Sequence, residues 1–472
     1  MHRRSKRILT VIGVIVVAFG VLYAIALARS TVKLRRAYAA LEADGRPMRA
    51  ADVIPPEVPD AQNAAVLYQS AALMLKSQAA GEKNLLERLA QLSGSIGQKS
   101  DHPDRIARLQ QEIAELQQLM DQPIVASALA TIEQGAQRPA CQFNREYSGA
   151  LSVDAPFLQD MRRLNRILEA RVHFDAEAGQ TARAWSTLQT QLKFADALRH
   201  DPTIMSQWTR ASAIGHSCRL IQNLCACEPP EAETLQRVEA LLQDLPDREP
   251  FIRAIDGERL LIGEWFFSLP PEEMDKAWRK ELMFGTNGHA SEAFLEALQR
   301  LVYRILTFRP MLVADHAAYL QTMRKRVQLL QGPYRSREES REFLNVSRWN
   351  PFTLQLARGS ENGIHCRMVA DVQITRAGLG LLRYRHAHGG FPQTLDALSL
   401  EGLIDPYTEK PLLYRPEGEG FVVYSVDEDL KDNGGTPQPE KQDSDPRRRK
   451  PLEGDRLWRF PNPENRVLTS NS

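Results

Sequence analysis

Cysteine is the first side chain to consider for chemistry, because thiolates bind metals and act as nucleophiles. Cys218, Cys225 and Cys227 lie close together in the sequence. A structural zinc site needs a second pair of ligands at matching spacing, and these three residues have none. Cys218 and Cys225 would also lie two turns apart on one face of a helix. We therefore interpret them as small buried apolar residues, with a disulfide among the three as the alternative outside the cytoplasm.

Charged residues beside aromatic ones form the second candidate for chemistry. Glu258, Arg259 and Glu264 adjoin the aromatic run 265–267. A carboxyl group becomes a general acid when its surroundings raise its pKa, and no strand-turn context here would do so. We predict ion pairs within a helical core for these residues. The alternative is a substrate site built from polar residues scattered through the helical region.

Other catalytic or ligand-binding patterns are lacking from the sequence. It has no Gly-x-Ser-x-Gly, no P-loop and no His-Glu-x-x-His. His386 and His388 fall at a predicted helix end, where an imidazolium would interact favourably with the helix dipole. The basic run 447–450 adjoins aspartates, which favours a solvated loop over a nucleic-acid patch. The formal net charge of +1 likewise predicts no nucleic-acid partner.

Length and composition indicate a globular protein of two or three folding units. The chain has 472 residues, of which 43% are hydrophobic and 25% charged. Its low aromatic content and many Ala, Leu, Gln and Arg residues favour helix. The five cysteines, which also include Cys141 and Cys366, are too few and too scattered for a disulfide scaffold.

An uncharged apolar run occupies residues 8–28 and follows a basic cluster at residues 3–7. About 20 helical residues span the ~30 Å hydrocarbon layer, so we predict a transmembrane anchor. A cleaved signal peptide is the alternative, because Ala26-Leu27-Ala28 has the small-x-small form of a cleavage site. Both interpretations place the bulk outside the cytoplasm, in the periplasm or beyond.

The rest of the chain predicts a stalk, a linker and a helical region. We expect residues 1–41 to form the anchor and stalk helix, and residues 42–60, which are rich in proline, to form a linker. Residues 61–340 show successive amphipathic helices, including one over 291–306. Residues 173–198 resemble a single helical hairpin of tetratricopeptide type, with Ala178-Gly179 at its turn, without a recoverable repeat period.

The sequence pattern changes near residue 362, which predicts a C-terminal domain over 362–472. The helix predicted over 364–384 should turn Arg376, Arg383 and Arg385 toward water. Short strands are predicted at 411–415, 420–425 and 456–460 from their Tyr, Val and Phe content. The polar insert 432–454 predicts a mobile loop.

The C-terminal region resembles the head of type II secretion major pseudopilins. The following residues fall on that pattern in order: Tyr384, Gly389, Phe391-Pro392, Leu395, Leu398, Asp405-Pro406-Tyr407, Pro411, Tyr414, Tyr424-Ser425 and Asp429. The resemblance implies a helix laid on a small antiparallel sheet and covers about a quarter of the chain. The fold class we predict is mainly α, with an N-terminal transmembrane helix, a multi-helix hairpin region and a small C-terminal α+β pseudopilin-like domain.

The same resemblance implies a calcium ion in the loop after the strand 420–425. The oxygen ligands that this sequence offers there are Ser425, Asp427, Asp429, Asp432 and Asp455. The sequence departs from the family because Asp427 and Leu430 stand where glycines are usual, and a long insert precedes Asp455. The alternative is an acidic surface loop that binds no metal.

The pseudopilin resemblance does not extend to polymerisation. The prepilin-peptidase signature is missing before residues 8–28, and over 300 residues separate that run from the head. The layout is similar to that of envelope proteins of planctomycete-type bacteria, a likeness that implies no activity. We expect a membrane-anchored, non-enzymatic envelope protein with protein partners. The alternatives are an exported enzyme and an accessory of a type II secretion or type IV pilus system.

Overall fold

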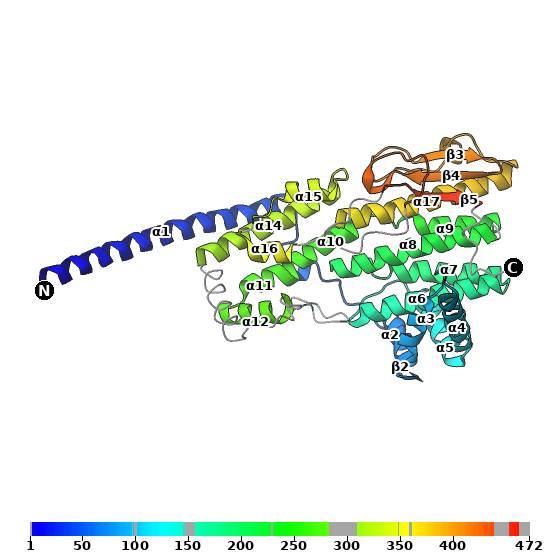
Figure 1. The fold of residues 1–472 in the computed structure, drawn as a ribbon, viewed down its shortest axis with the longest axis horizontal. Coiled ribbons are helices and arrows are strands. Elements are labelled where there is room, and N and C mark those ends of the chain that lie inside the picture. Colours follow the sequence, from blue (N-terminus) through cyan, green and yellow to red (C-terminus); the bar gives the residue numbers. More distant parts are fainter. Residues whose placement is uncertain are drawn as a thin grey trace.

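The computed structural model describes residues 2–96, 98, 102–144, 147, 156–227, 230–282, 309–347, 349–357, 361–438 and 453–461. The protein is mainly helical, with one long N-terminal helix and a small three-stranded sheet near the C-terminus, as predicted (Figure 1). The helix predicted over 291–306 and the basic run 447–450 lie outside the described residues.

The α-helices are α1 (His2–Ala43), α2 (Ala64–Lys76), α3 (Leu85–Ser93), α4 (Pro103–Met120), α5 (Pro123–Gly135), α6 (Pro156–Glu177), α7 (Thr181–Asp196), α8 (Ile204–Cys227), α9 (Ala232–Gln243), α10 (Glu249–Gly257), α11 (Trp265–Ser268), α12 (Pro271–Leu282), α14 (Arg309–Gln331), α15 (Arg337–Leu344), α16 (Pro351–Leu356) and α17 (Glu361–His388). The π-helical segment η2 (Glu258–Glu264) joins α10 to α11, and a small hairpin pairs β1 (Ala79–Ala80) with β2 (Lys83–Asn84).

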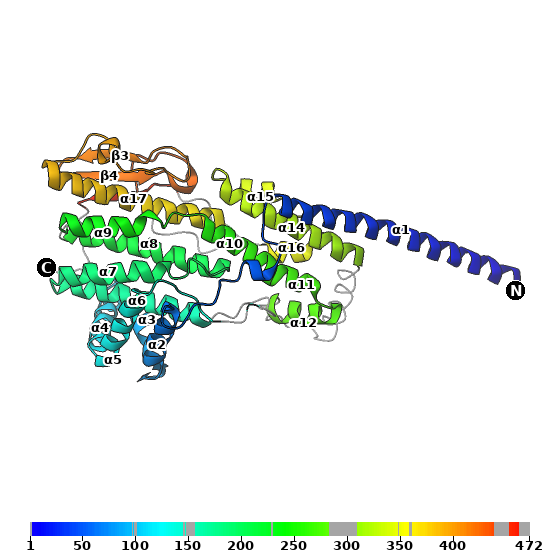
Figure 2. The ribbon, with the colours of Figure 1, turned by 180° about the vertical axis from the view of Figure 1, so that it is seen from behind.

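Helix α1 has two parts with different surroundings. Its apolar part projects from the body, and apolar side chains such as Val17 and Leu22 are about two-thirds exposed (Figures 1 and 2). From Thr10 onward this helix is long and apolar enough to cross a membrane. Beyond Ser30, one face packs along α14 and buries Ala37 and Leu41. A single helix therefore continues from the membrane-length run into the folded body.

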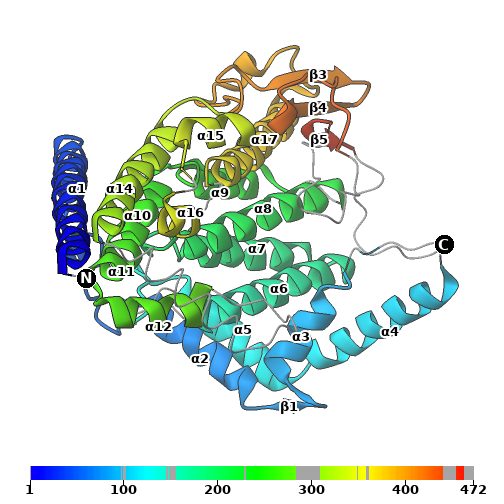
Figure 3. The ribbon, with the colours of Figure 1, turned by 60° about the vertical axis from the view of Figure 1, so that its left-hand side comes forward.

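Helices α6, α7, α8 and α9 form a layered array (Figure 3). The helical hairpin predicted around Ala178-Gly179 forms between α6 and α7. Gly179 adopts a φ of 70°, a left-handed conformation that glycine reaches without strain. Ala184, Leu188 and Leu192 recur at spacings of four, so they line one buried face of α7.

The C-terminal sheet has the order β3-β4-β5, and both pairs are antiparallel. Its strands are β3 (Leu413–Glu417), β4 (Gly420–Ser425) and β5 (Arg456–Phe460). The sheet lies on α17, at the end of the body away from the free end of α1 (Figure 1). The predicted strands 420–425 and 456–460 are confirmed at their exact bounds.

Helix α17 is buried on two sides, between the sheet and the helices α8 and α9. The prediction that Arg376 faces water was therefore wrong. Arg376 is only 8% exposed, and its guanidinium donates to the Gln373 side chain and the Glu401 carbonyl. One hydrophobic cluster consequently runs from Ala37 in α1 to Trp458 in β5, across the boundary predicted near residue 362. A second cluster fills α2 to α7.

Candidate functional site at the junction of anchor and body

The junction of α1 with α14 is held by polar contacts between residues far apart in the sequence. The Ser30 hydroxyl donates to the Pro310 carbonyl at 2.8 Å. At Asp44, the residue directly after α1, the Arg324 guanidinium donates to both carboxylate oxygens at 2.6 and 2.9 Å. These contacts fix the rotation and the register of the anchor helix against the body.

The segment η2 is a π-helical turn, a rare conformation that is frequent at functional sites. Gly263 permits the close packing of α14 on this turn, since a Cβ there would lie 2.1 Å from the Tyr319 ring. The turn directs Glu258, Arg259 and Glu264 into the junction. The ion pairs predicted for these residues are confirmed: Arg259 pairs with Glu264, and Glu258 pairs with Arg326.

Glu264 connects the anchor helix to the body. Its Oε2 accepts a hydrogen bond from the Tyr38 hydroxyl at 2.6 Å and lies 3.1 Å from Nε2 of His316. The His316 ring stacks on Phe267 with centroids 4.4 Å apart. Burial alone would raise the pKa of Glu264, but the hydrogen bonds from His316 and Tyr38 lower it below its usual value. Glu264 therefore accepts hydrogen bonds from both α1, through Tyr38, and α14, through His316.

A second set of contacts holds the linker that follows α1. Arg46 forms an ion pair with Asp256 of α10, and Arg259 donates to the Pro47 carbonyl. Arg259 is 1% exposed and lies 3.4 Å from Asp256 and 3.7 Å from Glu264. Its Nε and Nη1 have no hydrogen-bond partner among the described residues. Burying a guanidinium is costly, and here its contacts with Pro47, Asp256 and Glu264 join the linker to α10 and η2.

Arg326 is the centre of a third set and joins three elements. It is 2% exposed and pairs with Glu361 of α17 and, at 3.7 Å, with Glu258 of η2. Burial raises the pKa of Glu258 to about 7, and the negative charge of Glu361 adds to the shift while Arg326 opposes it. Arg326 therefore pairs with two carboxylates, and the raised pKa of Glu258, which the sequence did not predict, lets Glu258 take up a proton near neutral pH.

Replacing Glu258 by glutamine should remove a pH dependence of stability. The pKa of Glu258 is higher in the folded state than in the unfolded chain, where it is about 4.3. The folded protein then binds more protons between these values, so stability falls as the pH rises from about 5 to 7. We expect the unfolding free energy of the wild type to fall by about 2 kcal/mol more than that of Glu258→Gln between pH 5 and pH 8. Urea unfolding at both pH values tests this, and equal pH dependence of the two proteins would refute it.

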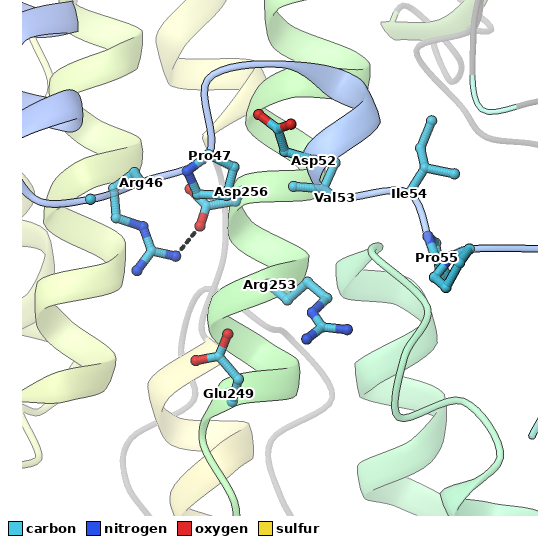
Figure 4. A pocket seen from close by; sticks show the side chains of 11 residues that line it. Arg46, Pro47, Asp52, Val53, Ile54, Pro55, Glu249, Arg253 and Asp256 are labelled. Atoms are coloured by element: carbon cyan, nitrogen blue, oxygen red, sulfur yellow. Dashed lines mark hydrogen bonds and ion pairs between the residues drawn. The ribbon is translucent and has the colours of Figure 1, made fainter.

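A polar hollow of about 350 Å³ lies beside this network, between the linker at residues 45–56 and α10 (Figure 4). The ion pair of Arg46 with Asp256 closes one side, and Arg253 and Glu249 line the floor. A second hollow, of about 260 Å³, lies on the other side of Arg46, against α14. Arg46, Arg259 and Glu264 pair with other residues of the junction, so these contacts join the anchor helix and the linker to the body.

The predicted calcium ligands lie in the loops around β4 and β5, where their oxygens accept hydrogen bonds from the protein. Asp427 accepts from Arg456 at 3.0 Å and from Gln438. Ser425 donates to Asp405 at 2.9 Å. Arg456 also pairs with Asp371 of α17, so this charge cluster ties the sheet to its helix.

The three remaining predicted ligands organise backbone. Asp429 accepts from the amides of Lys431 and Gly454, Asp432 accepts from the Gly434 amide and the Tyr424 hydroxyl, and Asp455 accepts from the amides of Asn433, Gly435 and Thr436. Within the described part of the chain, no three Asp, Glu, His or Cys side chains are arranged to hold a metal ion. The calcium site stays a prediction.

Leu430 gives a simple test of this loop. It adopts a φ of 59°, a left-handed conformation that costs a non-glycine residue about 1–2 kcal/mol, and it is 45% exposed. We expect Leu430→Gly to stabilise the protein by about 1 kcal/mol in urea unfolding. Leu73 lies exposed within α2, so the same change there should destabilise by about 1 kcal/mol. A loss of stability in Leu430→Gly would contradict the loop conformation.

The burial predicted for the cysteines of α8 is confirmed for two of them. Cys218 and Cys225 are buried, but Cys227 is exposed because it is the last residue of the helix, so the prediction for it was wrong; all five cysteines are free. Burial raises the pKa of the Cys218 thiol to about 12, so this thiol is unreactive at neutral pH. His386 and His388 lie in the last turn of α17.

Comparison with known proteins yields no match to a family model, to a curated protein or to a solved structure. The pseudopilin and tetratricopeptide resemblances therefore stay predictions.

Proposed function

We propose that this chain is a membrane-anchored envelope protein that holds a rigid helical body at the bilayer surface and acts by binding other proteins. Its amino terminus lies in the cytoplasm and its bulk lies in the periplasm or outside. The observation that carries the proposal is the docking of α1 on α14, within two residues of the end of the apolar run. A flexible tether would need no such contacts.

The continuity of α1 supports an anchor that is retained. Ala26-Leu27-Ala28 lies inside the helix, and Ser30, two residues after Ala28, is buried against α14. A cleavage site needs to be accessible to a peptidase, which favours a spanning helix over a removed signal peptide. The anchor then remains part of the folded protein.

The C-terminal unit supports a pseudopilin-like recognition module. Its helix lies on a three-stranded antiparallel sheet, the arrangement that the resemblance implies. Asp427 and Leu430, which replace the usual glycines, have φ values of 56° and 59°, the backbone conformation that glycine favours. The unit lies away from the free end of α1, so it is held out from the bilayer toward partners (Figure 2).

Photo-crosslinking in intact cells tests this function and shows whether partners bind the helical region or the C-terminal unit. A photoreactive amino acid replaces Leu73 or Met205 on the helical region, or Ile404 on the C-terminal unit, each of which is exposed. A residue of the buried core, Leu188, serves as the matched control. We expect specific protein adducts, identified by mass spectrometry after detergent extraction of membranes. Adducts at Ile404 with secretion or pilus components would favour the accessory interpretation. No adduct at any of the three exposed positions would contradict the proposal.

A further inference from the structure

Four basic side chains follow the apolar run on α1: Arg29, Lys33, Arg35 and Arg36. All four are exposed, and they form no ion pair with any other residue that the structure describes. No acidic residue occurs between residues 8 and 41. A dense, unpaired positive charge of this kind needs anionic partners or bulk water.

The docking of α1 fixes the direction in which these side chains point. Ser30, Ala37 and Leu41 recur at spacings of seven and four and are buried against the body. Arg29, Lys33 and Arg36 share a different face at spacings of four and three, so that face remains open. Because the seam with α14 prevents rotation of the helix, the basic face is fixed relative to the bilayer.

The distance of these residues from the end of the apolar run places them at the level of the lipid headgroups. At about 1.5 Å per residue, Arg29 to Arg36 occupy roughly the first 12 Å beyond the apolar run. The headgroup layer adds about 5–7 Å on each side of the hydrocarbon. Long basic side chains reach back toward phosphates from the upper part of this zone.

An independent residue from another element reaches the same level. Arg309 is exposed at the start of α14 and is adjacent to Pro310, whose carbonyl accepts the Ser30 hydroxyl at 2.8 Å. It too forms no ion pair with another described residue. The fold thus brings a fifth cation, from a position 280 residues away in the sequence, to the membrane-facing end of the body.

We propose that Arg29, Lys33, Arg35, Arg36 and Arg309 form a basic collar that binds anionic phospholipid headgroups of the leaflet next to the body. The proposal rests on the membrane anchoring proposed above. A basic residue near an anionic surface contributes about 1 kcal/mol, which is about fivefold in binding. The collar would enrich anionic lipids around the anchor and set the angle of the body to the bilayer.

Lipid selection in nanodiscs tests the collar. The full-length chain is reconstituted into discs of equal phosphatidylcholine and phosphatidylglycerol, and native mass spectrometry gives the ratio of the two lipids retained. One variant carries Lys33→Ala, Arg35→Ala, Arg36→Ala and Arg309→Ala. The matched control exchanges the same four positions between lysine and arginine, which keeps the charge. Residues 3–7 on the other side of the bilayer are unchanged in all three proteins.

We expect the wild type and the control to retain phosphatidylglycerol over phosphatidylcholine at least fivefold more strongly than the alanine variant. Equal ratios in the wild type and the alanine variant would overturn the collar, as would a control that selects no better than the alanine variant. A wild-type chain that does not enter nanodiscs would instead overturn the membrane anchor, and the collar with it.

Discussion

Replacing Arg326 by alanine is expected to lower the free energy of unfolding by about 3 to 5 kcal/mol. The change removes the cation that Glu258 and Glu361 share and leaves two carboxylates in a buried space. Burial alone would lower the pKa of Arg326, but these two carboxylates raise it above its usual value. The guanidinium therefore remains charged, and its loss disconnects η2, α14 and α17 together. Urea unfolding of the full chain in detergent, followed by circular dichroism, gives the difference.

Arg324 supplies the matched control for this prediction on the same helix. Its ion pair with Asp44 is more than 30% exposed on both sides, so Arg324→Ala should cost less than about 1 kcal/mol. Comparing the losses of unfolding free energy at Arg326 and Arg324, two residues apart, distinguishes the effect of a buried ion-pair network from that of a surface ion pair. Similar losses of unfolding free energy in both variants would show that the buried ion pairs of Arg326 stabilise the protein no more than a surface ion pair does.

Replacing Gly378 by alanine is expected to destabilise the protein by about 3 kcal/mol. Gly378 lies on the face of α17 that meets the sheet, and a Cβ there would lie 1.9 Å from the Trp458 ring. The indole is 1% exposed and is packed against Phe421, so it has no space into which to move. The sheet must then separate from α17, or the helix must shift between its two layers of neighbours. The loss is measured by urea unfolding as above.

Gly363 provides a control of opposite sign on the same helix. A Cβ at Gly363 would approach only Glu428, at 3.8 Å, so Gly363→Ala should stabilise by about 0.5 kcal/mol through helix propensity. Adding Trp458→Leu to Gly378→Ala should recover part of the loss, because it removes the ring that clashes. If the double variant is as unstable as the sum of its parts, the close contact is not the cause.

Local sequence signals predicted most of the elements correctly. The strand 420–425 is bounded by glycine and turn residues, and α1 follows from the length of its apolar run. Helix α5 was missed, although Pro123 at its first position and the spacing of Val125, Ala128 and Ile132 indicate its start and its buried face.

The π-turn η2 was missed for a physical reason. The sequence 251–267 fits a continuous α-helix, and the wider turn accompanies close packing between Gly263 and Tyr319, which are far apart in the sequence. The exposure predicted for Arg376 was wrong for a similar reason. Helical periodicity gives one apolar face, and it does not reveal a second layer that covers the polar side.

The candidate site could be predicted only in part. The charges at Glu258, Arg259 and Glu264 stand out among apolar neighbours, which indicated buried ion pairs. Their partners Tyr38 and Arg326 lie on other helices, and the Tyr38–Glu264 contact alone spans 226 residues. No local spacing encodes such a contact, so the junction becomes visible only in the fold.

The most direct test of the anchor is the intact mass of the chain after alkaline carbonate treatment of membranes. We expect a chain of 53.3 kDa, with residues 1–28 still attached, in the membrane pellet. A protein that is recovered in the soluble fraction and begins after Ala28 would contradict it, because α1 would then lack the apolar run that holds the body at the bilayer.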